Sequence, residues 1–232
     1  MTPGQRKLYL AELVRARQLL GTLVQGPDGI ARKRIIILSV LTRLRQICCH
    51  PALAEGDRAL GSGKFEALFE LLEPLRAEGQ KTLVFSQFVR CLDLIADAMK
   101  RRGIPYHVLT GETSTKKREE VVRAFTEDPE PSVFLVSLKA GGTGLNLTAA
   151  NHVVLFDPWW NPAVEAQAID RTHRIGQTRS VVAYRLYAEG TIEERIAELQ
   201  QRKAALARDV LGEDGFARSL TREDLEFLLA DE

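Results

Sequence analysis

The stretch SVFLVSLKAGGTGLNLTAANHVVLFD, residues 132–157, decides how this chain is expected to fold. Two short apolar runs, 132–137 and 152–157, flank a segment rich in glycine. Continuous apolar runs of this length are typical of strands that are buried on both faces, as in a parallel sheet. Similar runs recur elsewhere in the chain, at 81–86, 106–110 and 181–188.

Segments with helical spacing of apolar residues separate these runs. They are expected at 64–79, 87–103, 114–128 and 161–176, the last beginning with Asn161 as N-cap and Pro162 at its first position. This alternation predicts right-handed crossovers and an α/β fold with a parallel sheet flanked by helices. Two helices are expected before it, at 4–20 and 35–49, and a long charged helix after it, at 191–211.

The composition narrows the class of protein. The chain has 232 residues, and its 32 Lys and Arg against 31 Asp and Glu leave a formal charge of +1, so no overall basic field indicates nucleic acid. A formal net charge close to zero still allows a local stripe of basic residues on the surface. No apolar run has membrane-spanning length, no signal-peptide pattern occurs at Met1, and the 3 cysteines favour a reducing compartment. We expect a soluble cytoplasmic protein, and a helix-end packing role for QICCHP (46–51) in preference to a zinc site.

The glycine-rich segment permits two interpretations. Its backbone N–H groups could approach a phosphate closely, or the glycines could serve only a tight strand-to-helix turn. It is not a Walker A loop, and the nearest look-alike, GSGKFE (61–66), has Phe65 where a magnesium-binding hydroxyl is required. We therefore expect neither a complete phosphate cradle nor a metal site in this chain.

Two further segments carry candidate functional residues. In FDPWWNP (156–162), Trp159 could fill the core. Trp160 should point the other way on an extended chain, so one of the pair, with Trp160 as the candidate, is expected to meet solvent or a ligand. In EAQAIDRTHRIGQ (165–177), a helix would place Arg171 and Arg174 one turn apart on one face, with Gln167 and Asp170 nearby. These charges could form a solvated face, or they could stabilise phosphoryl charge.

Taken together, these segments resemble a known family. KTLVFSQF, VSLKAGGTGLNLTAANHVVLFDPWWNP and QAIDRTHRIGQ are similar to motifs IV, V and VI of the Swi/Snf-type branch of superfamily two helicase-like ATPases. LRQICCHPAL, SGKFEALFELL and EGTIEERIAELQQRK resemble the flanking segments of that family, so the resemblance covers almost the whole chain. It implies the second, C-terminal lobe of two RecA-like lobes that close over ATP while gripping double-stranded DNA.

The resemblance also implies a division into parts and a set of site residues. Residues 1–60 would join from the first lobe, 61–190 would form the RecA-like lobe, and 191–232 a brace helix and tail. Arg171 and Arg174 match two arginines that reach into the shared nucleotide site, and further residues would line that site: Gln167, Asp170, Gly142 and Gly144. ATP and Mg²⁺ would be held mainly by the first lobe, which carries the Walker A lysine and the Walker B acids.

The implied DNA contacts lie in other segments. Trp160 matches a tryptophan that approaches DNA, and phosphate-backbone contacts are expected from Ser86, Gln87, Lys139 and Thr143. Thr113 lies in LTGETS, a hydroxyl-rich turn where the family's usual Leu-Asp-Gly is replaced by Leu109-Thr110-Gly111. A phosphate contact from that turn remains compatible with the replacement.

The expected function is one half of an ATP-driven translocase or remodeller of double-stranded DNA, inactive without the first lobe. A bacterial, nucleoid-associated protein is preferred to a eukaryotic nuclear one. Three alternatives share the fold: a lobe of an RNA-polymerase-associated recycling ATPase, a non-catalytic interaction module, and a strand-separating helicase. The Gly-Gly-x-Gly-Leu-Asn-Leu and His-Arg-Ile-Gly-Gln details favour the Swi/Snf branch over the last of these.

Overall fold

The computed structural model describes residues 1–24, 29–54, 59–141, 147–172, 179–203 and 220–230. The chain forms two compact units, one made of Met1–Lys64 with Tyr187–Glu232 and the other of Phe65–Leu186. The boundary between them falls in the first turn of helix α3 (Gly63–Ala77), so the N-terminal and C-terminal segments of the chain belong to the same unit.

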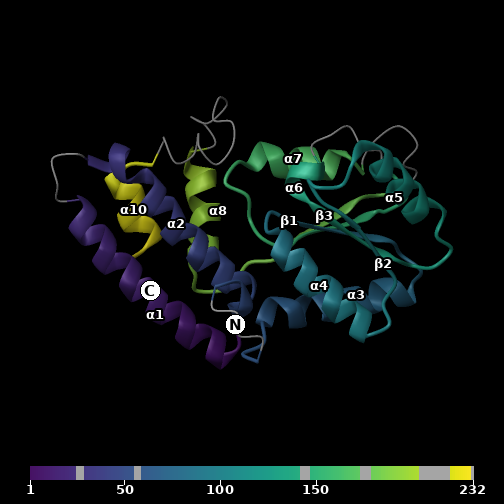
Figure 1. Ribbon diagram of the computed structural model, residues 1–232, viewed down its shortest axis with the longest axis horizontal. Helices are drawn as coiled ribbons and strands as arrows, with labels where there is room; N and C mark the ends of the chain where they lie inside the picture. The colour runs from purple at the N-terminus through teal and green to yellow at the C-terminus, as the bar shows by residue number, and fades with distance from the viewer. Residues whose placement is uncertain (25–28, 55–58, 142–146, 173–178, 204–219, 231–232) are drawn as a thin grey trace. The chain divides into compact units, whose positions relative to one another are not determined.

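The second unit contains a parallel five-stranded sheet in the order β2-β3-β1-β4-β5 (Figure 1). Its strands are β1 (Thr82–Ser86), β2 (Tyr106–Leu109), β3 (Val133–Ser137), β4 (His152–Leu155) and β5 (Val182–Arg185). Every residue of β1, β3 and β4 is buried, which explains why these strands appear in the sequence as continuous apolar runs. The α/β fold class expected from the sequence is confirmed.

Helices cover both faces of this sheet. Figure 1 shows α3 and α4 (Val89–Arg101) on one side, and α5 (Thr115–Glu127), α6 (Leu138–Gly141) and α7 (Pro162–Asp170) on the other. Buried side chains from the strands, α5 and the segment before α7 join in one core cluster, which includes Phe85, Phe125, Phe134 and Trp159. The sheet is thereby held rigidly, and the loops after its strands are anchored at one edge.

The first unit is helical. It comprises α1 (Pro3–Val24), α2 (Gly29–Cys49), a short 3₁₀ turn (Pro51–Leu53), α8 (Ile192–Lys203) and α10 (Arg222–Leu228). The Tyr9 hydroxyl accepts a hydrogen bond from the Ile192 backbone N–H at 2.7 Å and so ties α1 to the start of α8. Lys64 and Glu193 form a buried ion pair with a shortest N–O distance of 2.6 Å.

The QICCHP segment has a structural place in this unit. Cys48 and Cys49 are buried free thiols at the end of α2, and His50 Nδ1 accepts a hydrogen bond from the Ala52 N–H at the start of the 3₁₀ turn. Helix-end packing, as expected from the sequence, is what the structure shows. Among the described helices, none is both long and apolar enough to cross a membrane.

Candidate functional site at the carboxyl edge of the sheet

Two of the segments singled out by sequence begin at the carboxyl edge of the sheet. β1 ends at Ser86, the neighbouring β3 at Ser137 and β4 at Leu155. The glycine-rich segment follows β3, and the FDPWWNP segment follows β4. Open parallel sheets bind their ligands outside this edge, where loops from neighbouring strands come together.

A buried carboxylate links two of these strand ends. Asp157, two residues beyond the end of β4, accepts hydrogen bonds from the Ser86 hydroxyl and, at 3.2 Å, from the Gln87 backbone N–H. The Phe88 N–H donates in turn to Ser86 Oγ at 3.1 Å. Both Ser86 and Asp157 are almost fully buried. Ser86 therefore serves to fix the β1–α4 turn, and its burial does not support the DNA contact expected of it.

Asp157 is a site residue that the sequence reasoning did not single out. Its signal was an acid at the end of an apolar strand, in HVVLFD (152–157). Buried carboxylates require compensating hydrogen bonds, and here they come from the neighbouring strand end. An acid in this position therefore predicts a cross-strand partner, which the sequence could suggest but not identify.

Gln87 differs from its neighbour Ser86. Its carboxamide Nε2 and Oε1 atoms are buried, and within the described parts of the chain neither has a hydrogen-bond partner. Buried side-chain amides without partners are rare in folded proteins. The side chain lies at the corner where β1 turns into α4, so its unsatisfied polar atoms belong to the candidate site.

The two tryptophans are both buried. Trp159 is 6% exposed and Trp160 2%, so neither tryptophan faces solvent, and the expectation of a solvent-facing Trp160 is wrong. Side chains alternate between faces only within a strand, and β4 has already ended at Leu155. DNA contact by Trp160 stays a prediction that its burial does not support.

Glu165 and Asn161 fix the start of α7. The Trp159 backbone N–H donates to Glu165 Oε1 at 2.8 Å, and Arg185 Nε donates to Glu165 Oε2 at 3.1 Å. Asn161 accepts a hydrogen bond from the Ala163 N–H and is followed by Pro162, which is the N-cap arrangement expected from the sequence.

Arg171 lies at the other end of α7, beside the end of the glycine-rich segment. The helix ends at Asp170, and Arg171 is its C-cap residue. The Arg171 carbonyl accepts a hydrogen bond from the Leu147 N–H at 3.2 Å, and Arg171 is only 6% exposed. The helix was expected to continue to residue 176, but it ends at Asp170, so Arg171 does not lie within it and that expectation is wrong from Arg171 onward. Residues 173–178 lie outside the described residues, and the placement of Arg174 relative to Arg171 stays a prediction.

The remaining expected residues are only partly described. Gln167 and Asp170 are exposed on α7, whereas Gly142, Thr143 and Gly144 lie outside the described residues. Lys139 belongs to α6, which follows β3 directly, but its side chain is not among those described. No cluster of three or more metal-ligating side chains occurs in the described ranges.

Thr113 has a local structural role. Its hydroxyl accepts a hydrogen bond from the Thr110 N–H at 3.2 Å, and its carbonyl accepts one from Arg118 Nε at 2.8 Å. These bonds close the LTGETS turn before α5. The turn is thus held in one shape, and a phosphate contact by Thr113 stays a prediction.

Comparison with known proteins assigns this arrangement to a family. Residues 63–176 match the helicase conserved C-terminal domain. The C-terminal domain of the Sulfolobus solfataricus SWI2/SNF2 ATPase has a TM-score of 0.79 and 33% identity to this chain, covering 100% of this chain and 95% of that one. The chain belongs to the SWI2/SNF2 ATPase family. It corresponds to the C-terminal domain of the ATPase, which confirms the resemblance and the RecA-like fold inferred from the motifs.

Two further matches place this SWI2/SNF2 domain within longer proteins. The Sulfolobus solfataricus SWI2/SNF2 ATPase core in complex with double-stranded DNA has a TM-score of 0.82 and 34% identity, and the match covers 100% of this chain and 48% of that one. An uncharacterized ATP-dependent helicase of Mycoplasma pneumoniae is 40% identical over 226 residues, which make up 97% of this chain. The chain spans only 21% of the length of that relative.

Proposed function

We propose that this SWI2/SNF2 domain is the second motor lobe of an ATP-driven translocase of double-stranded DNA. The observation that carries the proposal is the position of Arg171. This buried arginine caps the end of α7, and its carbonyl accepts a hydrogen bond from the N–H of Leu147, the last residue of the glycine-rich segment. Two motifs with phosphate-binding chemistry are therefore adjacent.

Arg171 and Arg174 would act on the γ-phosphate of an ATP held mainly by the first lobe. A guanidinium is permanently charged and donates from a planar fork that matches phosphoryl oxygens. Its contribution is greatest where negative charge develops in the transition state. Gln167, Asp170, Gly142 and Gly144 would line the same side of the nucleotide site. Mg²⁺, bound by the acids of the first lobe, would neutralise the β- and γ-phosphate oxygens.

DNA would contact the carboxyl edge of the sheet through its phosphate backbone. The S. solfataricus core, which resembles this chain, was solved with double-stranded DNA. Lys139 and Thr143 follow β3 and would supply a charge and a hydroxyl. The DNA contact expected of Gln87 is supported by its buried carboxamide, which has no hydrogen-bond partner in the described structure. DNA or the first lobe would supply that partner on binding. Contacts to phosphate position a protein on the duplex without reading sequence.

The test is ATP hydrolysis by the full-length protein, measured with and without duplex DNA. Arg171→Ala and Arg174→Ala should each lower the DNA-stimulated kcat, on the order of 10³-fold or more for a true arginine finger. Arg171→Lys should recover only part of the rate, because an ammonium lacks the planar fork. ATP binding by the variants should change little, since the first lobe provides most of the nucleotide contacts.

Arg179→Ala is the matched control. Arg179 is exposed, and its guanidinium donates a hydrogen bond to Gln80 Oε1 at 3.3 Å. The control should keep the wild-type rate. Equal rates for wild type, Arg171→Ala and Arg174→Ala would remove the arginine-finger assignment.

A further inference from the structure

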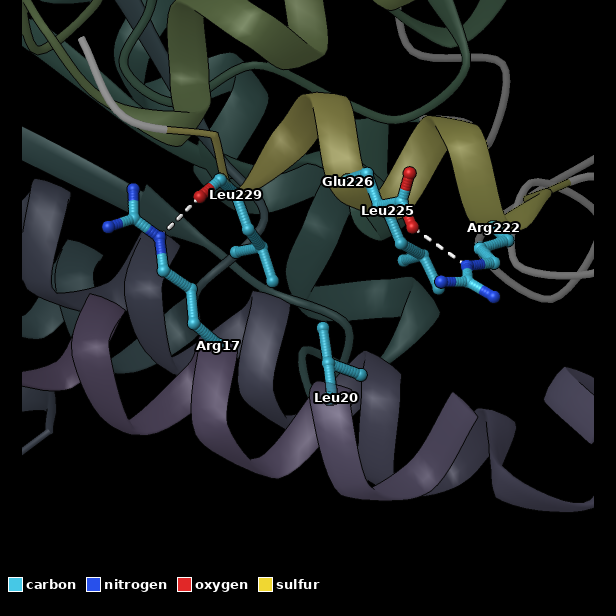
Figure 2. A pocket seen from close by; sticks show the side chains of 7 residues that line it. Arg17, Leu20, Arg222, Leu225, Glu226 and Leu229 are labelled. Carbon is cyan, nitrogen blue, oxygen red and sulfur yellow. Dashed lines mark hydrogen bonds and ion pairs between the residues drawn. The ribbon is translucent and has the colours of Figure 1, made fainter. Parts of the chain in front are cut away.

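Two hollows follow one another along α1 in the helical unit. The first lies between α1 and α10 and has a volume of about 290 Å³. In Figure 2, Leu20 of α1 faces Leu225 of α10 and Leu229, the C-cap residue of that helix. Arg17 lies at one end of the hollow and the Arg222–Glu226 pair at the other. The hollow thus has apolar walls and charged ends.

The second hollow continues toward the N-terminus of α1 and shares Arg17 with the first. Its volume is about 410 Å³, and α8 and the end of α10 complete its walls. Leu10 and Val14, one turn apart on α1, line it and are 45% and 50% exposed. A single exposed leucine is ordinary on a protein surface, but an exposed apolar pair lining a hollow is not.

The α1 residues that line the two hollows form one helical face. Arg6, Leu10, Leu13, Arg17 and Leu20 follow one another at intervals of three and four residues, the spacing at which side chains share a face. From Arg6 to Gly21 this face is about 22 Å long at 1.5 Å per residue. We call the two hollows together the α1 groove, and Arg17, which lines both, marks the point where they meet.

The α1 groove is already shaped by bonds between its walls. Arg17 donates to the Leu229 and Ala230 carbonyls at 2.5 and 2.6 Å, and Arg195 donates to the Phe227 carbonyl at 2.8 Å. These bonds fix the end of α10 against α1 and α8. A preformed groove spares a ligand part of the ordering cost of binding.

The charges of the α1 groove select the chemistry of a ligand. Among the described residues, its lining contains one carboxylate, Glu226, and four arginines: Arg6, Arg17, Arg195 and Arg222. Cationic rims around an apolar floor complement an amphipathic helix that carries acidic residues beside its apolar side chains. DNA is a poorer fit, because a phosphate backbone would use the arginines and leave the exposed leucine and valine side chains without a partner.

We propose that the α1 groove binds an acidic amphipathic helix of a partner protein. The groove lies wholly in the helical unit, and the proposal does not depend on the arginine fingers. Leu20, Leu225 and Leu229 would receive one apolar side chain of the helix, and Leu10 and Val14 another one or two turns away. Acidic residues of the helix would lie beside the arginines at the rims.

The binding test uses the 232-residue chain and a fluorescein-labelled synthetic helix with leucines at helical spacing and glutamates beside them, measured by fluorescence anisotropy. A peptide of the same composition with scrambled leucine spacing, and one with lysine in place of glutamate, should each bind at least about tenfold more weakly. Unlabelled duplex DNA should not displace the labelled peptide.

Two variants locate the binding. A side chain at Gly21 would meet nothing within 4 Å at its Cβ, so Gly21→Phe should be accommodated and should occupy the first hollow. Leu10→Glu/Val14→Glu places carboxylates on exposed positions of the second. Each should weaken peptide binding about tenfold or more. Lys7→Glu, on an exposed α1 position outside both hollows, should stay within about twofold while making a similar change of charge.

Four results would overturn the proposal. The first is equal affinity for the matched and scrambled peptides, and the second is unchanged affinity in both groove variants although circular dichroism shows that they are folded. Displacement of the peptide by duplex DNA would assign the groove to nucleic acid. Finally, binding by an Asp231→Asn/Glu232→Gln variant but not by wild type would assign the groove to the chain's own acidic end.

Discussion

The Ser86 hydroxyl and the Asp157 carboxylate are two polar groups that the fold removes from water. They bond each other across neighbouring strand ends, and Asp157 also accepts the Gln87 N–H. A buried acceptor that loses its donor costs about 1–3 kcal/mol. The energetic role of Ser86 thus follows from its partner, whereas its motif alone indicated a DNA contact.

We expect Ser86→Ala to lower the free energy of unfolding by about 1–3 kcal/mol, measured by urea denaturation, because Asp157 loses a donor. DNA affinity of the folded variant should stay within about twofold of wild type, since Ser86 is buried. Ser114→Ala is the control: Ser114 precedes α5 but makes no side-chain capping bond, so its loss should cost under about 0.5 kcal/mol. A Ser86→Ala variant with native stability and weakened DNA binding would restore the DNA-contact assignment.

Lys64 and Glu193 show how two elements far apart in sequence are joined. Lys64 lies in the first turn of α3 and Glu193 in the first turn of α8, and the Glu193 carboxylate also accepts the Ala188 N–H at 2.9 Å. Burial by itself lowers the pKa of Lys64, but the adjacent Glu193 carboxylate raises it, and the net direction is upward. The lysine therefore stays charged in the folded protein.

Breaking this buried pair should destabilise the helical unit strongly. Lys64→Met should cost about 3–5 kcal/mol of unfolding free energy, because it leaves Glu193 buried without its counter-charge. Lys64→Met/Glu193→Met should cost clearly less than the single variant. The folded-state pKa of Lys64 is raised, so its contribution is complete below the unfolded value of about 10.4 and declines only at higher pH.

The comparison for this pair is the exposed pair Arg202–Glu198 on α8. Glu198→Gln should change stability by less than about 1 kcal/mol, as exposed pairs contribute little. Urea denaturation at neutral pH measures all these variants. A Lys64→Met variant as stable as wild type, or a double variant less stable than the single one, would contradict the role assigned to the pair.

The elements that could be predicted from sequence are those with a local signal. The apolar runs predicted the ends of the buried strands to within one or two residues, and Asn161-Pro162 predicted the start of α7. Helix α10 was missed although Thr221 and Asp224 form a capping box, because the helix has only 7 residues. Pairings such as Ser86 with Asp157, and the burial of Trp160, depend on tertiary contacts that no local pattern contains.

At the scale of the whole molecule, the chain contains residues that are expected to contact a nucleotide but lacks the motifs that catalysis would require. A backbone hydrogen bond holds Arg171 beside the end of the glycine-rich segment, while the sequence contains no Walker A lysine motif. Transition-state stabilisation by an arginine requires a bound and oriented nucleotide. Under the proposed function, the lobe would complete a nucleotide site without forming one by itself.

We expect purified 1–232 to show no ATP hydrolysis above background, with or without duplex DNA, and to bind duplexes only weakly. With a formal charge of +1, the dissociation constant should lie within or above the non-specific range of roughly 10⁻⁴ to 10⁻⁶ M. Affinity should fall steeply with salt and should be equal for duplexes of unrelated sequence, because phosphate contacts carry no base information. Anisotropy titrations at two salt concentrations, together with a coupled ATPase assay, measure both properties.

Adding the separately purified first lobe should restore DNA-stimulated hydrolysis, and Arg174→Ala in 1–232 should prevent that restoration. Hydrolysis by 1–232 alone would show instead that the chain contains a complete nucleotide site.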